Sequence, residues 1–412
     1  MPPVRPSRRA YRLAAVTSHP VQYQSPLFQR LAADAQIDLT VFYGHDGSVV
    51  GDLDQEFGVP VQWDRPLLDG YASVVLKPHA KRLGALRRLS ADAGIIRHLW
   101  SGHFDAVFIH SYATRVSILA CAGAFLSRTP VLLRTESERL RPRAWWVEAL
   151  KYVFLRPLFA MIAGFLVIGK ANRCFFEYYG VRPPREFLTP YSVDNEYFLH
   201  AREELRSSRD AFRQQYGWSR DTFVIGFTGK LIPRKRAEDV IDAAARLQAE
   251  GHDVGLLMIG DGPCRQRLEE RVRSLQLRSV VFAGFKNQTE LARQYICLDA
   301  AVLPSRFETW GLVLNEAMLF GLPVMTTDMV GAGLDLIEDG KSGYIFKVGD
   351  VASLTDGLRR LAVSPDLRAD LGRHAEQTVR RFSYEHCVQG ILDALACVSA
   401  TSSRTLQSPA PH

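Results

Sequence analysis

Short apolar runs of strand length alternate with amphipathic stretches along most of the chain. In the first half, the runs with this character cover residues 13–17, 37–43, 106–110, 131–135 and 164–168. The stretches 83–100 and 117–126 between them have the length and apolar spacing of helices. Strands that are apolar throughout, with helices between them, are typical of parallel sheets covered on both faces.

A second set of apolar runs predicts a second domain of the same kind. Its strands are expected at 223–228, 255–259, 279–283, 300–303, 323–327 and 344–346. The highly charged segment 203–220 separates the two sets, so we place the domain boundary close to 195–205. In open parallel sheets, ligands bind at the carboxyl ends of the strands, so chemistry is sought in the loops that follow them.

Composition fits an ordinary globular enzyme or binding protein and excludes several other classes. The 412 residues are 47% hydrophobic and carry a net charge of +7. Four of those charges lie in the N-terminal segment, which leaves no basic stripe typical of a nucleic-acid binder. The six cysteines lack the spacing of a zinc site or a disulfide scaffold. We expect a cytoplasmic protein with a flexible basic arm at 1–10 and a disordered tail at 400–412.

The strongest chemical signal is the segment 304–318, PSRFETWGLVLNEAM, which follows a strand and runs into a helix. Glu308 is expected in the turn before the helix and Glu316 about two turns inside it. Between them lie the backbone N–H groups of Thr309, Trp310, Gly311 and Leu312, and a helix N-terminus attracts anions. A nucleotide sugar carries hydroxyls at both ends and an anionic diphosphate between them. Two carboxylates that flank an anion site suit such a ligand. The alternative, a dipole-compensating Glu308 and a solvated Glu316, is disfavoured by the loop position and by Gly311.

A second signal lies in the loop after the strand 223–228. Lys230 and Lys235 stand there, where cations can meet a diphosphate; a solvated basic loop is the alternative. The loop is not a Walker motif. The glycines of 260–263 form only half of a dinucleotide fingerprint, because Arg265 stands where its third glycine belongs, and no NAD role is assigned.

Together, these residues and the segments 315–318, 321–324, 327–332 and 339–343 resemble glycosyltransferase group 1. This is family 4 of the retaining nucleotide-sugar glycosyltransferases, and the resemblance covers most of 222–390. It implies an α/β protein of the GT-B fold, with two Rossmann-like domains whose parallel sheets face each other across a cleft. The acceptor domain is then expected at 11–200, the donor domain at 201–384 and a helix returning to the first domain at 385–399.

The resemblance also implies roles for the donor-site residues. Glu308 would contact the donor sugar near the reacting carbon, and Glu316 would hold the ribose hydroxyls. Lys230 and Lys235 would bind the diphosphate, assisted by the N–H groups of Thr309 to Leu312, and Phe285 would touch the nucleobase. Arg236 departs from the family pattern, which has glycine there, and would add a charge near the phosphates.

In the first domain, His110 resembles the family histidine that faces the transferred sugar, although a strand-end histidine can equally be structural. His19, Arg134 and Glu136 are assigned to the acceptor side. Ser18-His19-Pro20 replaces the Gly-Gly turn that many members carry after the first strand. No metal and no cofactor besides the nucleotide sugar are expected.

The function expected from the resemblance is retaining, metal-independent transfer of a sugar to a saccharide or lipid-linked acceptor, in surface polysaccharide or glycolipid biosynthesis. A GT-B-fold nucleotide-sugar epimerase or hydrolase and a non-catalytic donor-binding scaffold stay open as alternatives. Donor, acceptor and oligomeric state are not determined by the sequence.

The segment 139–156 raises the question of membrane contact. It combines five Arg and Lys with Trp145 and Trp146, a composition typical of a bilayer interface on the cytosolic face. However, Trp146, Leu150 and Phe154 share one helical face and could belong to the core. Both interpretations stay open at this point.

Overall fold

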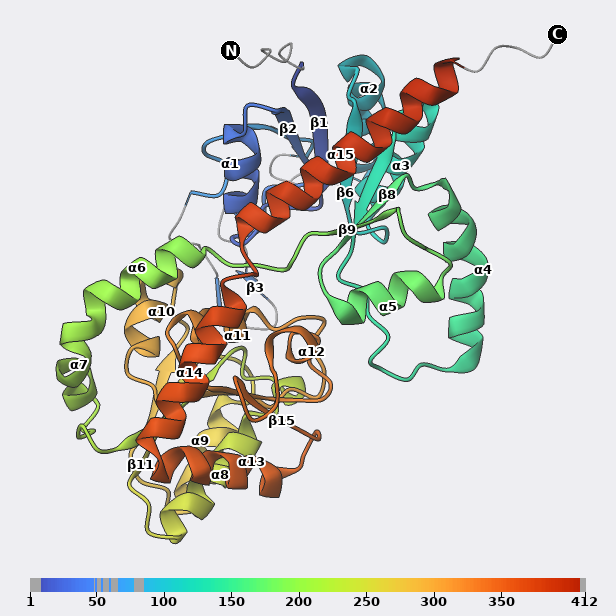
Figure 1. Ribbon diagram of the computed structural model, residues 1–412. Coiled ribbons are helices and arrows are strands. Elements are labelled where there is room, and N and C mark those ends of the chain that lie inside the picture. Colours follow the sequence, from blue (N-terminus) through green and yellow to red (C-terminus); the bar gives the residue numbers. More distant parts are fainter. Residues whose placement is uncertain are drawn as a thin grey trace.

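The computed structural model describes residues 9–47, 49, 53–54, 59–60, 66–77 and 85–407, which form two α/β domains (Figure 1). The first domain holds a parallel sheet in the order β5-β2-β1-β6-β7-β8-β9. Its strands are β1 (Tyr11–Thr17), β2 (Ile37–Tyr43), β5 (Ala72–Val75), β6 (Ala106–His110), β7 (Val131–Arg134), β8 (Gly164–Val167) and β9 (Glu186–Leu188). Its helices are α1 (Ser25–Ala33), α2 (Ala85–Gly102), α3 (Arg115–Leu126), α4 (Trp145–Met161) and α5 (Lys170–Tyr178). A small antiparallel pair joins β3 (Leu53–Asp54) to β4 (Val59–Pro60).

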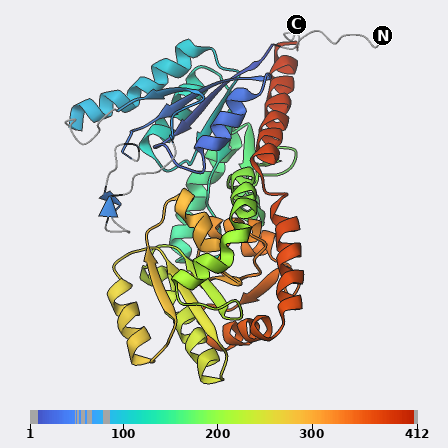
Figure 2. The ribbon, with the colours of Figure 1, turned by 90° about the vertical axis from the view of Figure 1, so that its left-hand side faces the viewer.

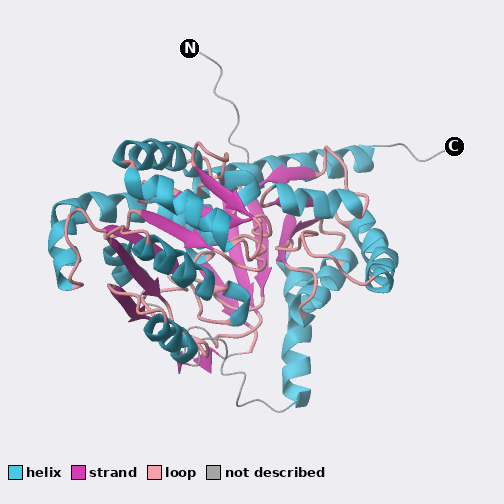
Figure 3. Ribbon diagram, turned by 90° about the horizontal axis from the view of Figure 1, so that it is seen from below, coloured by secondary structure: helices cyan, strands magenta, loops and turns pink. Residues whose placement is uncertain are grey.

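The second domain holds a six-stranded parallel sheet in the order β12-β11-β10-β13-β14-β15. Its strands are β10 (Phe223–Thr228), β11 (Val254–Ile259), β12 (Val280–Gly284), β13 (Ala300–Leu303), β14 (Val324–Thr327) and β15 (Gly343–Phe346). Its helices are α8 (Ala237–Ala249), α9 (Arg265–Ser274), α10 (Gln288–Tyr295), α11 (Leu312–Leu319), α12 (Gly333–Leu336), α13 (Val351–Val363) and α14 (Pro365–Val379). Figure 3 shows the strands of both domains lying among helices, as the apolar pattern predicted.

The central strands begin and end within two residues of their predicted positions. The sequence did not reveal β5 and β9, which are the two edge strands of the first sheet. Both are short, and their residues are only partly buried or exposed, so neither shows the continuous apolar run of a central strand.

The domains are joined by two crossings of the chain. The first leads from β9 into α6 (Asn195–Leu205), followed by η2 (Arg206–Ser208) and α7 (Arg209–Gln215). The second is α15 (Tyr384–Gln407), which leaves α14 and runs back along the first domain (Figure 2). There Ile391 and Leu395 are buried in one hydrophobic cluster with Leu13, Phe28 and Leu132.

The sequence predicted a tail without structure from residue 400, but α15 continues to Gln407. Its preceding turns are docked on the first domain, so further turns need only helix propagation and no nucleation. Residues 408–412, and residues 1–8 of the predicted arm, lie outside the described residues. None of the described helices is long and apolar enough to cross a membrane.

Candidate functional site

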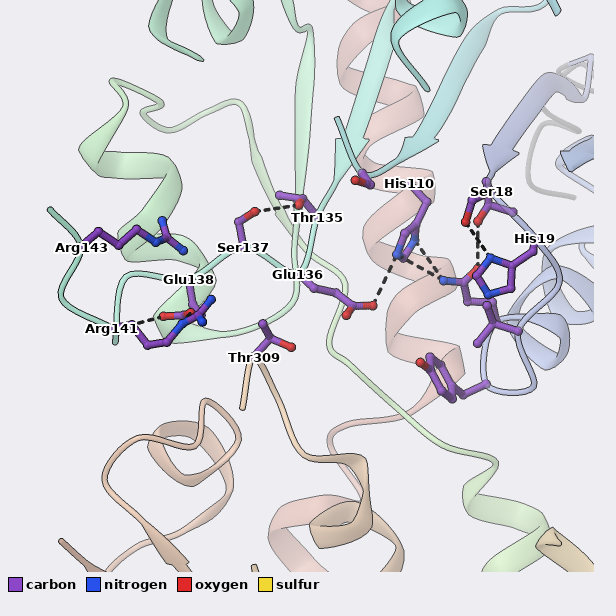
Figure 4. Close-up of a pocket in the computed structure, with 15 residues that line it drawn as sticks. Ser18, His19, His110, Thr135, Glu136, Ser137, Glu138, Arg141, Arg143 and Thr309 are labelled. Atoms are coloured by element: carbon purple, nitrogen blue, oxygen red, sulfur yellow. Dashed lines mark hydrogen bonds and ion pairs between the residues drawn. The ribbon is translucent and has the colours of Figure 1, made fainter. Parts of the chain in front are cut away.

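The carboxyl ends of three neighbouring strands of the first sheet line a cavity of about 460 Å³ (Figure 4). Ser18 and His19 follow β1, His110 ends β6, and the segment 135–138 follows β7. Thr309 of the second domain lies across from them, so the cavity is formed between the domains. Among the described residues, no group of three or more His, Cys, Asp or Glu side chains is placed to hold a metal ion.

His110 and Glu136 point toward one another inside this cavity (Figure 4). Their closest atoms, His110 Nε2 and Glu136 Oε1, are 3.5 Å apart. The side-chain amide of Gln24 lies 3.2 Å from His110 Nε2, and the Tyr191 hydroxyl donates to Glu136 Oε1. Burial raises the pKa of Glu136, but the hydrogen bonds and charge of His110, with Tyr191 and Arg134, outweigh it and lower the pKa. Glu136 therefore presents an ionised carboxylate beside His110.

His19 also faces the cavity, beside a second histidine. Its ring stacks on that of His45, with centroids 5.3 Å apart, and Ser18 Oγ lies 2.8 Å from its Nδ1. Burial, followed by the charges of His45 and His110, lowers the pKa of His19. A neutral imidazole at neutral pH follows, which can both donate to and accept from a sugar hydroxyl.

Arg134 lies elsewhere than the sequence suggested. Its side chain is buried, and its guanidinium carbon lies 5.3 Å from the ring centroid of Tyr191. It therefore supports Tyr191, and through it Glu136, and does not form part of the described cavity lining.

In the second domain, Glu308 directly precedes Thr309, and two cations from the loop after β10 hold its carboxylate. Lys235 Nζ lies 2.8 Å and Arg234 Nη1 2.9 Å from Glu308 Oε1. Both Lys235 and Glu308 are only 12% exposed, which strengthens the ion pair relative to a surface one. Arg234 was not among the predicted site residues, although it lies in the basic run 234–236. Arg141 of the first domain stacks on the neighbouring Phe307, 3.6 Å from the ring centroid.

Arg236 does not add its charge to this cluster. Its φ of +49° is in the left-handed region, where the family's glycine is favourable. Its guanidinium makes two hydrogen bonds to Asp239, at 2.7 and 2.8 Å, in the first turn of α8. The positive charge of Arg236 was expected near the phosphates, but Asp239 neutralises it at the start of α8.

The loops after β10, β11 and β12 pack backbone against backbone. The N–H of Gly229 donates to Ile259 O, and that of Gly260 donates to Gly284 O, both at 2.9 Å. A Cβ on Gly260 would lie 1.9 Å from the carbonyl oxygen of Gly229, so only glycine fits there. This close approach accounts for the glycines of 260–263. It also brings Phe285, which follows β12, to the same sheet edge as Lys230.

Helix α11 begins later than the sequence suggested. Glu308 pairs with Val330 as a β-bridge, and Gly311 has a φ of +110°, so the first helical residue is Leu312. Glu316 consequently lies about one turn inside the helix, not two. Among the hydrogen bonds of the described residues, none is donated by the backbone N–H groups of the segment 309–312. These groups are oriented as orphan donors at a helix N-terminus.

The side chain of Trp310 is not directed at a ligand. It is buried against Tyr191 and Phe382, and its Nε1 donates to Asn315 Oδ1 at 2.8 Å. Asn315 in turn donates to the backbone oxygen of Tyr191 in the first domain. Trp310 can therefore serve a ligand through its N–H group alone, while its indole joins the domains.

Glu316 is buried beside Tyr295, whose hydroxyl donates to Glu316 Oε2 at 2.7 Å. Burial raises the pKa of Glu316 to about 7, although the hydrogen bond from Tyr295 opposes the shift. A solvated helix position, the alternative considered for this residue, is excluded by its burial.

This raised pKa predicts how stability depends on pH. The folded protein binds the Glu316 proton more tightly than the unfolded chain, whose ordinary pKa is 4.5. The contribution of Glu316 to the free energy of unfolding therefore falls as pH rises from about 4.5 to about 7. Glu316→Gln keeps an acceptor for Tyr295 and removes the titration. Relative to the wild type, the free energy of unfolding of the variant should therefore rise by about 3 kcal/mol at most across this pH window. Melting curves at both ends of the window measure this gain; a difference that does not change with pH would contradict the assignment.

Comparisons with known proteins identify a family and relatives for part of the chain. Residues 208–378 match the family of glycosyl transferases group 1. Alpha-D-kanosaminyltransferase of Streptomyces kanamyceticus is 31% identical over 182 residues, which are 44% of this chain and 46% of that protein. N-acetyl-alpha-D-glucosaminyl L-malate synthase of Bacillus anthracis is 30% identical over 200 residues, 48% of this chain and 50% of that protein. The chain thus spans about half the length of the curated relatives it matches.

Solved structures resemble the whole fold. Anabaena Alr3699/HepE in complex with UDP and glucose superposes with a TM-score of 0.70 and 19% identity, covering 94% of this chain and 99% of that one. The lipopolysaccharide outer core galactosyltransferase WaaB superposes with a TM-score of 0.64 and 16% identity, over 93% and 99% of the chains. At these identities the likeness shows the fold, and the predicted GT-B architecture is confirmed.

Proposed function

We propose that this protein, whose residues 208–378 match the family of glycosyl transferases group 1, transfers a sugar from a nucleotide-diphosphate sugar to a saccharide or lipid-linked acceptor. The reaction is proposed to retain the anomeric configuration and to need no metal ion. The observation that carries the proposal is the cationic cluster around Glu308. Glu308 directly precedes Thr309, the second-domain residue that lines the cavity together with His110 and Glu136.

The leaving nucleoside diphosphate gains negative charge as the bond to the sugar breaks, so groups that bind this charge accelerate the reaction. Lys235 and Lys230 are proposed to supply two such charges, and the N–H groups of the segment 309–312 supply dipoles. In the structure Lys235 is paired with Glu308. A diphosphate would compete for Lys235 and release the carboxylate toward the sugar.

The sugar develops positive charge in an oxocarbenium-like transition state. Glu308, freed from Lys235, can stabilise this charge from the second domain. From the first domain, His110 is positioned by Gln24 and Glu136 to hydrogen-bond a hydroxyl of the transferred sugar. Buried Glu316 is proposed to hold the ribose hydroxyls.

The proposed donor and pathway rest on two further likenesses. The related fold of HepE was solved with UDP and with glucose, which makes UDP-glucose the first donor to test. WaaB is described as a lipopolysaccharide outer core galactosyltransferase, which supports a role in surface polysaccharide or glycolipid synthesis.

A donor screen tests the proposal. The protein is incubated with UDP-glucose and other nucleotide sugars, with and without saccharide and lipid-linked acceptors, and nucleoside diphosphate release is measured. We expect release that depends on an acceptor, and a product anomer equal to that of the donor by NMR. Epimer formation from donor alone, or absence of turnover with every pair despite donor-induced thermal stabilisation, would contradict transfer.

His110 provides a prediction of its own. His110→Ala removes a hydrogen bond to the sugar beside the Glu136 carboxylate, and such bonds are worth ~1.5–3 kcal/mol. We expect kcat/KM to fall about ten- to a hundredfold while the melting temperature stays close to wild type. His374→Ala, at an exposed position of α14, is the matched control and should keep full activity. A His110→Ala variant with wild-type kcat/KM would make His110 a structural histidine.

A further inference from the structure

Helix α4 lies at the outer edge of the first domain (Figure 1) and packs through one face only. Leu155 and Phe159 are buried on that face. On the other side, six large apolar side chains are 54–81% exposed: Trp145, Trp146, Leu150, Val153, Phe154 and Met161. The described residues expose fourteen large apolar side chains in all, so this one helix carries an unusual share of them. The core interpretation of Trp146, Leu150 and Phe154 is therefore wrong.

The exposed apolar side chains form a continuous strip. Ala149, Pro157 and Ala160 are also exposed and fill the spaces between the larger residues. At 3.6 residues per turn, all of these positions fall on one half of the helix. The exposed charged residue on that half is Arg156, at its margin. A strip of this length and composition is not an ordinary solvated helix face.

The charges around the strip are almost all positive. Arg139, Arg141 and Arg143 precede α4, and Lys151 and Arg156 lie on it. The single carboxylate of the segment, Glu148, is largely buried, where it accepts from Tyr179 and faces Arg143. Arg139 and Arg143 share Glu148, and Arg141 pairs with Glu138, so the five cations near the apolar strip outnumber these two carboxylates.

We propose that α4 docks onto an anionic phospholipid bilayer, with the apolar strip among the acyl chains and the cations at the headgroups. Tryptophan and arginine are the residues whose amphipathic side chains favour that interface. A symmetric contact with a second copy of this chain would bring two cationic borders together, whereas anionic lipid neutralises them. Arg141 and Arg143 also line the interdomain cavity, so docking would place the cavity mouth near the bilayer. If the proposed transferase function holds, this geometry favours a lipid-linked acceptor.

Vesicle flotation of the full-length protein tests the proposal without donor or acceptor, so its outcome is independent of the proposed function. Vesicles of phosphatidylglycerol with phosphatidylcholine are compared with vesicles of phosphatidylcholine alone, at low and high salt. We expect the protein to float with the anionic vesicles, and more weakly with neutral ones or at high salt. Phe154→Glu should lower the bound fraction at least about tenfold, because an apolar contact with lipid is replaced by a charge.

Val363→Glu is the matched control, since Val363 on α13 is 64% exposed and Phe154 is 66% exposed. It should bind vesicles like the wild type, and both variants should keep the wild-type melting temperature. Absence of flotation with anionic vesicles, or equal binding by Phe154→Glu, would overturn the proposal. A wild-type dimer that Phe154→Glu converts to a monomer, without vesicle binding, would also overturn it and assign the strip to a second copy.

Discussion

Replacing Glu308 by Gln should lower kcat about a hundredfold without raising the KM for the donor. The amide keeps the shape of the side chain but cannot stabilise positive charge at the reacting carbon, and electrostatic groups of this kind contribute effects of about this size. In the structure Glu308 also neutralises Lys235 and Arg234. Without the Glu308 carboxylate, both cations can pair with the diphosphate, so the affinity for the donor should stay the same or increase. Steady-state kinetics with varied donor measure both constants.

The control for this prediction is Glu316→Gln. Glu316 is proposed to hold ribose hydroxyls in ground and transition states alike, so its loss should raise the donor KM by about tenfold and leave kcat nearly unchanged. A Glu308→Gln variant that turns over like the wild type would remove Glu308 from catalysis. If the two variants show the same pattern of kcat and KM, the separation of their roles fails.

Replacing Trp310 by Ala should destabilise the protein by about 3–5 kcal/mol, the usual cost of removing a large buried aromatic side chain. Trp310 is 3% exposed and packs against Tyr191 of the first domain and Phe382 before the last helix. For a protein of this size, the melting temperature should fall by roughly 5 °C. Thermal unfolding followed by circular dichroism measures the change.

Two further variants make this result specific. Trp310→Phe keeps most of the apolar contact and loses the hydrogen bond to Asn315, so its melting temperature should lie between those of the wild type and Trp310→Ala. Trp145→Ala removes a tryptophan that is 81% exposed and should melt like the wild type. If Trp310→Ala and Trp145→Ala have the same melting temperature, Trp310 does not join the domains in solution.

The sequence by itself determined the architecture of both domains and the place of the candidate site. Strands β10 and β13 were predictable to the residue because they are buried on both faces and must be apolar throughout. Once these strands were placed, parallel topology put the loops carrying Lys235 and Glu308 at their carboxyl ends, and the first sheet likewise put His110 at the end of β6. Parallel strands gather their carboxyl ends at one edge, so residues far apart in the chain were expected near one cleft.

The tertiary structure alone decided which groups meet and which face water. It paired Glu308 with Lys235, turned Arg236 toward Asp239 and buried the indole of Trp310 between the domains. It also left Trp146 and Phe154 exposed, although their helical spacing is equally that of a core face. Periodicity fixes which side chains share a face of an element, because it depends only on local geometry. Whether that face packs against another element or faces solvent depends on distant segments of the chain. It therefore cannot be predicted from the residues of one helix.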